Sequence, residues 1–316
     1  MKQMIVALIG ASMLACGNAS AEELMFGSTS ASSSHYGYIV AVGKLINESG
    51  TDLNATVVET GAAMDNIRRM ERGQMDLGII TTNVVQHAVS GTKKFDGRPQ
   101  DLELLWVYAP APQNVIMRAD AGVDSLVALD GVRLNPGIKG SATETTTEAV
   151  FGVLGIKPEW VRGSTTDIVD AIKDNGLAGY VKSGSPSGLD SSTMDLATAT
   201  PIRVLGLDDA QAGKIKAAMP DISVVEVVAE GIPAYKTWSF GVGVAATSAM
   251  SEETAYQIVK AVMADKSAQG NALASVKGLD LARLTLDYAT VPLHPGAMRW
   301  FAENGYTVPD HLKPMR

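Results

Sequence analysis

Residues 24–34 read LMFGSTSASSS, a short apolar run that passes into a loop of small residues just before a helix-like stretch. The same order recurs four more times, with loops at 60–62, 81–83, 137–143 and 183–188. The first N–H groups of a helix have no partner within the helix and lie at the positive end of its dipole, so each loop could hold an anion. Because these loops carry almost no residues capable of covalent chemistry, the pattern favours binding over catalysis.

Strand-like and helix-like segments alternate from Leu24 to about Arg203, which is typical of β-α-β units and a mainly parallel sheet. Apolar periodicity predicts helices over 36–48, 63–72, 83–90, 144–154 and 166–174. Glycines stand where C-terminal caps of these helices are expected, at Gly50, Gly73, Gly91, Gly155 and Gly176. A later helix is expected over 251–264, with Ser251 as its N-cap. The sequence therefore predicts an α/β fold.

Two stretches mark places where the chain is expected to pass from one structural unit to another. Ala-Pro-Ala-Pro at 109–112 follows a strand-like run, and a second such change is expected within 230–244. We therefore expect a discontinuous first lobe, 22–109 with 245–316, and an inserted second lobe, 110–244. Ligands of open α/β sheets bind at the carboxyl ends of the strands, so two such lobes would enclose a ligand, and closure about a hinge would bury it.

The chain is acidic and its charges are spread along the sequence. Its 316 residues carry a net charge of −8, the sequence pI is about 5.1, and Lys and Arg form no cluster. This composition argues against nucleic acid or an anionic membrane surface as a partner. Any bound anion must therefore be held by local dipoles and by one or two placed cations. The apolar content of 46% suffices for a large core, and we expect a monomer.

The N-terminal segment is expected to be an export signal. Lys2 supplies a positive charge, residues 4–16 form an apolar stretch, and Ala19-Ser20-Ala21 fits a cleavage site. Cleavage after Ala21 would remove residues 1–21, whose apolar stretch is too short to span a bilayer. Cys16 is either a lipidation site or an apolar residue of the signal, and the cleavage site close behind it favours the second reading. We expect an exported chain that is not embedded in the membrane.

Motifs for catalysis and for metal binding are weak. Ser90 and Lys93 fit S-x-x-K, but Ser90 lies at the end of an expected helix and no S-D-N motif accompanies it. No phosphate-binding glycine motif follows the first strand. The histidines are too scattered for the spacing of a metal site and stand at positions 35, 87, 294 and 311. We therefore expect no enzyme activity, no metal and no cofactor.

Longer motifs suggest a family. They are TGAAMDN at 60–66, RGQMDLG at 72–78, AVSG at 88–91 with Phe95, GIKGSAT at 137–143, and VPLHPGAMRWFAENG at 291–305. In this order they resemble the substrate-binding receptors of TRAP transporters of the TAXI type. The last stretch is the most specific, because it is similar to that family's P-L-H-P-G-A…Y-x-E-x-G tail.

The resemblance implies a two-lobed, type II-like periplasmic binding protein, each lobe a mixed, mainly parallel sheet flanked by helices. It implies that the ligand is a small organic anion, such as a dicarboxylate, a keto acid or glutamate, bound in the cleft between the lobes. The receptor would deliver this ligand to the membrane permease subunits of a TRAP transporter. A two-lobed sensor protein that presents its ligand to a membrane histidine kinase is an alternative that the sequence leaves open.

Ligand-binding residues are expected at the loops that match the family and at the last loop of the series. They are Ser33, Ser34, His35, Tyr36, Thr60, Gly61, Thr82, Asn83, Lys139, Gly140, Ser141, Thr143 and Ser185. His35 could face either the cleft or the surface, and Lys139 could either pair with a ligand carboxylate or remain a solvated charge. His294 in the tail is expected to fix that segment by a hydrogen bond.

Departures from the family pattern bear on the ligand. Asn83 stands where Asp is common, and Lys139 stands where a small residue or proline is common. His35 replaces the first of two tyrosines, while Tyr36 keeps the second. The changes at 83 and 139 both make the cleft less negative, which leads to the hypothesis that the ligand carries more negative charge than an amino acid.

Overall fold

The structure is a computed structural model that describes residues 21–229 and 231–314. Its strands are β1 (Glu22–Gly27), β2 (Leu53–Val58), β3 (Leu77–Thr81), β4 (Leu102–Arg118), β5 (Arg133–Asn135), β6 (Glu159–Trp160), β7 (Gly179–Ser183), β8 (Ile202–Leu205), β9 (Ser223–Ala229) and β10 (Ile232–Thr247). Its helices are α1 (Ser34–Asn47), α2 (Ala63–Glu71), α3 (Thr82–Ser90), α4 (Ala142–Leu154), α5 (Thr165–Lys173), α6 (Ser191–Ala199), α7 (Asp209–Ala218), α8 (Glu252–Ala264), α9 (Ala268–Ala272), α10 (Leu281–Tyr288) and α11 (Pro295–Glu303). Apart from Ala21, the predicted signal segment 1–21 with Cys16 lies outside the described residues.

In the described residues the strands form one mixed sheet in the order β2-β1-β3-β10-β4-β7-β5-β6, while β8 pairs with β4 and β9 pairs with β10. β1 is parallel to β2 and β3, and β5 is parallel to β6 and β7, as β-α-β connections require. The antiparallel pairs all involve β4 or β10. The predicted α/β class is confirmed.

The two long strands β4 and β10 run through both lobes and change partners midway. β4 pairs with β10 up to Pro112 and with β7 from Gln113, and β10 pairs with β9 up to Ser239 and with β3 from Val242. The predicted Pro-containing segment 109–112 therefore stays extended inside a strand. We propose the boundaries 22–109 with 245–316 and 110–244 for the two lobes, because these changes of partner lie close to them.

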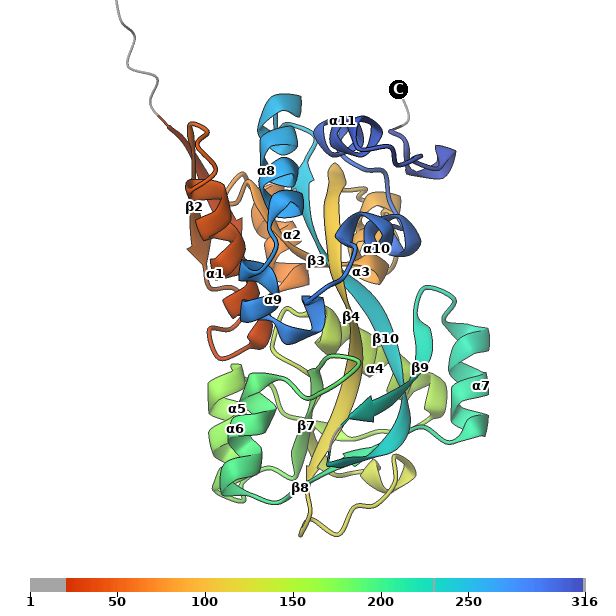
Figure 1. The fold of residues 1–316 in the computed structure, drawn as a ribbon. Coiled ribbons are helices and arrows are strands. Elements are labelled where there is room, and N and C mark those ends of the chain that lie inside the picture. The colour runs from red at the N-terminus through yellow and green to blue at the C-terminus, as the bar shows by residue number, and fades with distance from the viewer. Residues whose placement is uncertain (1–20, 230, 315–316) are drawn as a thin grey trace, which may run out of the picture.

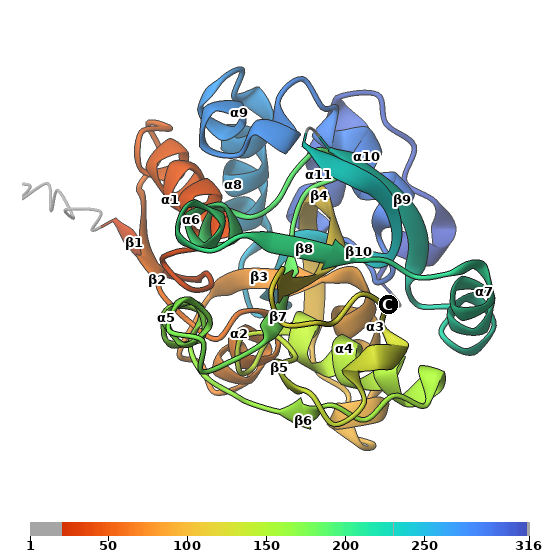
Figure 2. The ribbon, with the colours of Figure 1, turned by 90° about the horizontal axis from the view of Figure 1, so that it is seen from below.

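Figure 1 shows β4 and β10 as the two long ribbons that join the first lobe above to the second lobe below. The first lobe holds β1 to β3 with α1 to α3 and α8 to α11, and the second holds β5 to β8 with α4 to α7. In the view from below, helices lie on both sides of the second lobe's strands, α5 and α6 on one side and α7 on the other (Figure 2). No helix in the described part of the chain combines the length and apolar character needed to cross a membrane.

A buried aromatic cluster ties the middle of β4 to the first lobe. Trp106 Nε1 donates to the Tyr38 hydroxyl at 3.1 Å, and that hydroxyl donates to Gln269 Oε1 at 2.7 Å. The rings of Tyr38 and Tyr108 stack with centroids 4.0 Å apart. Buried polar aromatic groups need such partners. The cluster fixes Tyr108, which in turn contacts His35 at the start of α1.

Most helix ends follow the predicted pattern, with one clear correction. Gly91 and Gly155 are left-handed C-caps of α3 and α4, and Ser251 caps α8 by accepting a hydrogen bond from Thr254 N at 3.0 Å. The prediction of Gly176 as the cap of α5 is wrong, because Asn175 adopts the left-handed conformation with φ 59°. Asn adopts this conformation more readily than most other non-glycine residues, so the turn closes one residue earlier.

Candidate ligand-binding site between the lobes

Four helices begin at one buried cavity of about 50 Å³. Their N-cap residues are Ser33 for α1, Ala62 for α2, Thr81 for α3 and Ser141 for α4, and all four line the cavity. Ser33, Ala62 and Thr81 come from the first lobe and Ser141 comes from the second, so the cavity lies between the lobes. Because each helix N-terminus favours negative charge, the arrangement concentrates positive potential in one place.

The N-termini of α2 and α3 lack a side-chain cap. Alanine has no side-chain acceptor, and the Thr81 side chain accepts no hydrogen bond from the first turn of its helix. Thr81 Oγ1 is buried and has no hydrogen-bond partner among the described residues. Thr60 fixes the turn that precedes α2, because its hydroxyl donates to Ser28 O at 2.7 Å and accepts from Ala62 N at 3.1 Å. Polar groups left unpaired in a polar cavity are the groups that a ligand would satisfy.

Lys182, at the end of β7, supplies the positive charge of the cavity and is only 7% exposed. Its Nζ lies 3.3 Å from Ser33 Oγ and 3.4 Å from Asp190 Oδ1. Asp190 Oδ2 accepts from Ser33 Oγ at 3.0 Å and from Ser34 N at 2.9 Å. A carboxylate from the second lobe therefore occupies the N-terminus of α1, which belongs to the first.

The pKa of Asp190 reflects these contacts. Burial alone would raise it, but the charge of Lys182 and the hydrogen bonds from Ser192 and Ser34 lower the pKa of Asp190 to about 2. The carboxylate is thus ionised at neutral pH, and it shows how this protein holds an anion: two backbone N–H groups, two hydroxyls and one ammonium group.

His35 lines the cavity as a neutral imidazole. Burial lowers its pKa to about 4, although the charge of Asp190 acts in the opposite direction. Its Nδ1 lies 3.1 Å from the Tyr108 hydroxyl. If that hydroxyl donates to Nδ1, the ring proton is on Nε2 and is free to donate to a ligand. The cleft-facing alternative for His35 is therefore the one that the structure adopts.

Four of the thirteen predicted residues line this cavity, namely Ser33, His35, Ser141 and Thr143. Ser34 lies beside it, where its hydroxyl accepts from Ser191 N at 2.9 Å across the lobes. Thr60 and Thr82 make internal hydrogen bonds, the second by accepting from Gly241 N at 3.0 Å. Tyr36 and Ser185 are partly buried and are not among the lining residues.

The remaining predicted residues lie farther out along the cleft. Gly61, Lys139 and Gly140 line its outer part, where Asp65 N donates to Gly140 O at 3.1 Å. A Cβ on Gly61 would come within 2.6 Å of Lys139 O, so glycine permits this close approach of the lobes. Asn83 lines a separate, mostly apolar pocket and donates to Thr146 Oγ1 at 3.0 Å.

Sequence reasoning missed Lys182, Asp190 and Thr29, and it placed the fifth loop too early. After β7 the chain turns through Ser185 and Gly188, and α6 begins only at Ser191 with Asp190 as its N-cap. A lysine at the end of an apolar strand was the available signal for Lys182. Its partners lie on other elements, one of them 149 residues away, so local pattern did not reveal the pairing.

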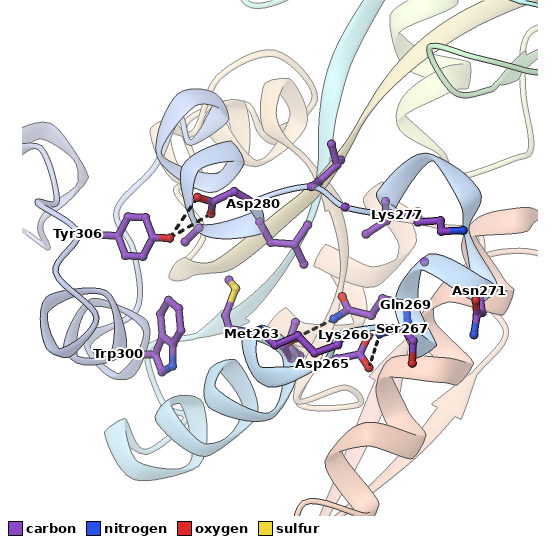
Figure 3. Close-up of a pocket in the computed structure, with 17 residues that line it drawn as sticks. Met263, Asp265, Lys266, Ser267, Gln269, Asn271, Lys277, Asp280, Trp300 and Tyr306 are labelled. Carbon is purple, nitrogen blue, oxygen red and sulfur yellow. Dashed lines mark hydrogen bonds between the residues drawn. The ribbon is translucent and has the colours of Figure 1, made fainter.

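A larger pocket of about 390 Å³ lies on the first lobe between α8, α9, α10 and the tail (Figure 3). Its carboxylates serve local structure. Asp265 accepts from the N–H groups of Ser267, Ala268 and Gln269, and Asp280 accepts from the Tyr306 hydroxyl at 3.2 Å, as Figure 3 shows. The two carboxylates are therefore already paired, and the pocket's lysines, Lys266 and Lys277, are exposed, in contrast to the buried Lys182 of the interlobe cavity.

The two lobes and the polar cavity between them define a protein with the fold of periplasmic solute-binding proteins. The chain belongs to the NMT1-like family, whose family model matches residues 26–305.

Solved structures with TM-scores above 0.5 agree with this fold at low sequence identity. A periplasmic transporter structure matches with a TM-score of 0.56 and 11% identity, covering 90% of this chain and 97% of that one. The periplasmic binding protein BugD matches with a TM-score of 0.54 and 13% identity, covering 80% and 86%. The ligand-binding component of an ABC-type import system from Staphylococcus aureus has a TM-score of 0.49 at 11% identity, covering 91% and 94%.

Proposed function

We propose that this protein is a monomeric periplasmic receptor that binds a small organic anion between its lobes and delivers it to a membrane transporter. The two uncapped helix N-termini, of α2 and α3, in an interlobe cavity lined by Lys182 carry the proposal. A helix N-terminus contributes roughly 0.3 to 2 kcal/mol toward an anion, and a charge-assisted hydrogen bond contributes about 1.5 to 3 kcal/mol. Three or four such contacts, reduced by desolvation and closure, are compatible with a Kd near micromolar, about −8 kcal/mol.

Mass spectrometry of the protein under native conditions tests this proposal directly. We expect one small anion to be released when the purified protein is denatured. Thermal unfolding with added carboxylates should show stabilisation that grows with ligand concentration. A protein that retains no compound and shows no thermal shift with any organic anion would contradict the receptor function.

We propose further that the cavity binds its ligand without transforming it. Ser90 lies at the C-terminal end of α3 and Lys93 in the turn that follows, and neither lines the cavity. A catalytic histidine contacts a nucleophile on one side and a carboxylate that orients it on the other. The ring of His35 is instead hydrogen-bonded to the Tyr108 hydroxyl. Recovery of the ligand unchanged after incubation with the protein is the expected result, and the appearance of a product would overturn this part of the proposal.

The TRAP partner is proposed from the sequence resemblance, and the structure explains its most specific motif as a packing element. His294 Nε2 donates to Met250 O at 3.1 Å, and its Nδ1 accepts from Gly296 N at 3.2 Å. A Cβ on Gly296 would lie 2.2 Å from Glu252 O, so α11 can approach α8 only with glycine there. The prediction that His294 fixes the tail by a hydrogen bond is confirmed.

Reconstituted transport tests the partner. Proteoliposomes that contain the membrane subunits of a TRAP transporter encoded beside this gene should take up the ligand only when the receptor is added. Neighbouring genes for an ATP-driven permease, or for a membrane histidine kinase, would contradict the TRAP assignment and leave the receptor function intact.

A further inference from the structure

The interlobe cavity is small because the lobes are in contact on several sides. Contacts that cross between the lobes include Ser34 N to Asp190 Oδ2 at 2.9 Å and His87 Nε2 to Asp221 Oδ2 at 2.9 Å. The cavity volume is about 50 Å³. This is small beside the roughly 300 to 1,000 Å³ of pockets that bury drug-sized ligands. A ligand enclosed in this closed arrangement must therefore be short.

The charges of the cavity restrict the ligand further. Among the described residues that line it, Lys182 is the one charged side chain, and Asp190 already pairs with it. No carboxylate lines the cavity to receive an ammonium group, and burying an unpaired charge is costly. The two residues that suggested a more highly charged ligand, Asn83 and Lys139, do not line it. The cavity thus suits one negative charge and no positive charge.

Polar and apolar walls come from different elements. Hydroxyl groups at the helix N-termini form the polar wall, with Thr81, Ser141 and Thr143 among them. Strands form much of the apolar wall through Ile79 of β3, Val181 of β7, and Phe240 and Val242 of β10. A second carboxylate would have to lie against this apolar wall, where it would lose hydration without gaining partners.

We infer, given the proposed receptor function, that the ligand is a short-chain monocarboxylate. Its carboxylate binds at the uncapped N-termini of α2 and α3, near the Thr81 hydroxyl and the Lys182 ammonium group. Its short aliphatic body lies along the strands. Pyruvate, lactate, propionate and butyrate have this chemistry, whereas succinate, 2-oxoglutarate and glutamate are longer and carry additional charges.

Isothermal titration of the mature protein with these compounds tests the inference. We expect at least one of the short monocarboxylates to bind about 100-fold more tightly than succinate, 2-oxoglutarate or glutamate. Tightest binding of a dicarboxylate or of glutamate would overturn the inference while supporting the receptor function. Failure of every organic anion to bind would overturn both.

A pair of threonine variants locates the carboxylate. Thr81 and Thr147 both have buried hydroxyls without a partner, but only Thr81 lines the cavity. Thr81→Val preserves shape and should weaken monocarboxylate binding about tenfold, because it removes a hydrogen bond to a charged group. Thr147→Val should leave the Kd unchanged, and the melting temperature of both variants should stay near that of the wild type. Equal Kd values for Thr81→Val and the wild type would refute the assigned position.

Discussion

The N-termini of α1 and α3 reach the same cavity, but their polar groups are satisfied in different ways. At α1, the carboxylate of Asp190 accepts from Ser34 N and from the Ser33 hydroxyl, and Lys182 balances its charge. At α3, Thr81 offers no side-chain cap and its own hydroxyl is unpaired. The first N-terminus joins the lobes, and the second stays uncapped, which is where we propose that the ligand binds.

Because of this difference, we assign closure of the lobes to the N-terminus of α1 and ligand recognition to that of α3. The contact at α1 comes entirely from the protein, so it stabilises the closed arrangement whether or not a ligand is present. A ligand adds contacts at the free N-termini and shifts the population further toward closure by its preference for that state. Changes at the Asp190 group should therefore affect stability and closure, and changes at Thr81 should affect binding.

Lys182→Met should produce the largest change in stability. It leaves Asp190 as a buried carboxylate without its cation, and removing one partner of a buried pair costs about 3 to 5 kcal/mol. The variant should also lose ligand binding, which titration calorimetry would show. The free energy of unfolding is measured by urea denaturation at pH 7.

The matched control is Lys173→Met, which breaks an exposed pair with Asp195. Exposed pairs contribute little, so its free energy of unfolding should stay close to that of the wild type. Equal stability of Lys182→Met and Lys173→Met would show that the Asp190 contact at α1 does not hold the lobes.

Acid should destabilise the folded protein through the protonation of His35. Burial lowers the pKa of His35 to about 4, whereas an unfolded histidine titrates near 6.5. Between these pH values His35 binds a proton in the unfolded state but not in the folded state. The free energy of unfolding therefore falls as the pH drops from about 6.5 to about 4. The shift corresponds to a loss of about 3 kcal/mol over this range.

Urea denaturation between pH 7 and pH 4 measures this loss. His35→Gln should remove most of it, because glutamine does not titrate, while His311→Gln at an exposed position should retain it. A pH dependence that is the same in all three proteins would place the acid sensitivity outside the cavity.

The sequence predicted the local parts of this site well. The loops at 60–62, 81–83 and 137–143 do supply the N-caps Ala62, Thr81 and Ser141, because apolar periodicity and small-residue loops mark helix starts locally. Parallel strands then bring those starts to the same edge of the sheet.

The parts that depend on closure were not predictable in this way. Asp190 and Lys182 acquire their role only when the second lobe meets α1, and nothing in their local pattern encodes that contact. Asn83 and Lys139 stand at motif positions where this sequence departs from the family pattern, and both lie outside the cavity. Asn83 in the first turn of α3 donates to Thr146, and Lys139 lies in the outer cleft. Helix starts are local features, whereas the charge balance of a cleft depends on both lobes.

Ser34→Ala should produce the smallest change and should act on closure alone. The Ser34 hydroxyl accepts from Ser191 N at 2.9 Å across the lobes, and the variant keeps the bond from its own N–H to Asp190. Loss of one partly exposed hydrogen bond costs about 0.5 kcal/mol, which raises the ratio of open to closed molecules about twofold. Small-angle X-ray scattering without ligand should show a slightly larger radius of gyration, which returns to the wild-type value when ligand saturates the site.

Ser49→Ala removes an exposed hydroxyl bonded to Ile46 O far from the interface, and it should leave the radius unchanged. An identical radius for Ser34→Ala and Ser49→Ala would mean that the backbone contact to Asp190 alone accounts for closure at α1.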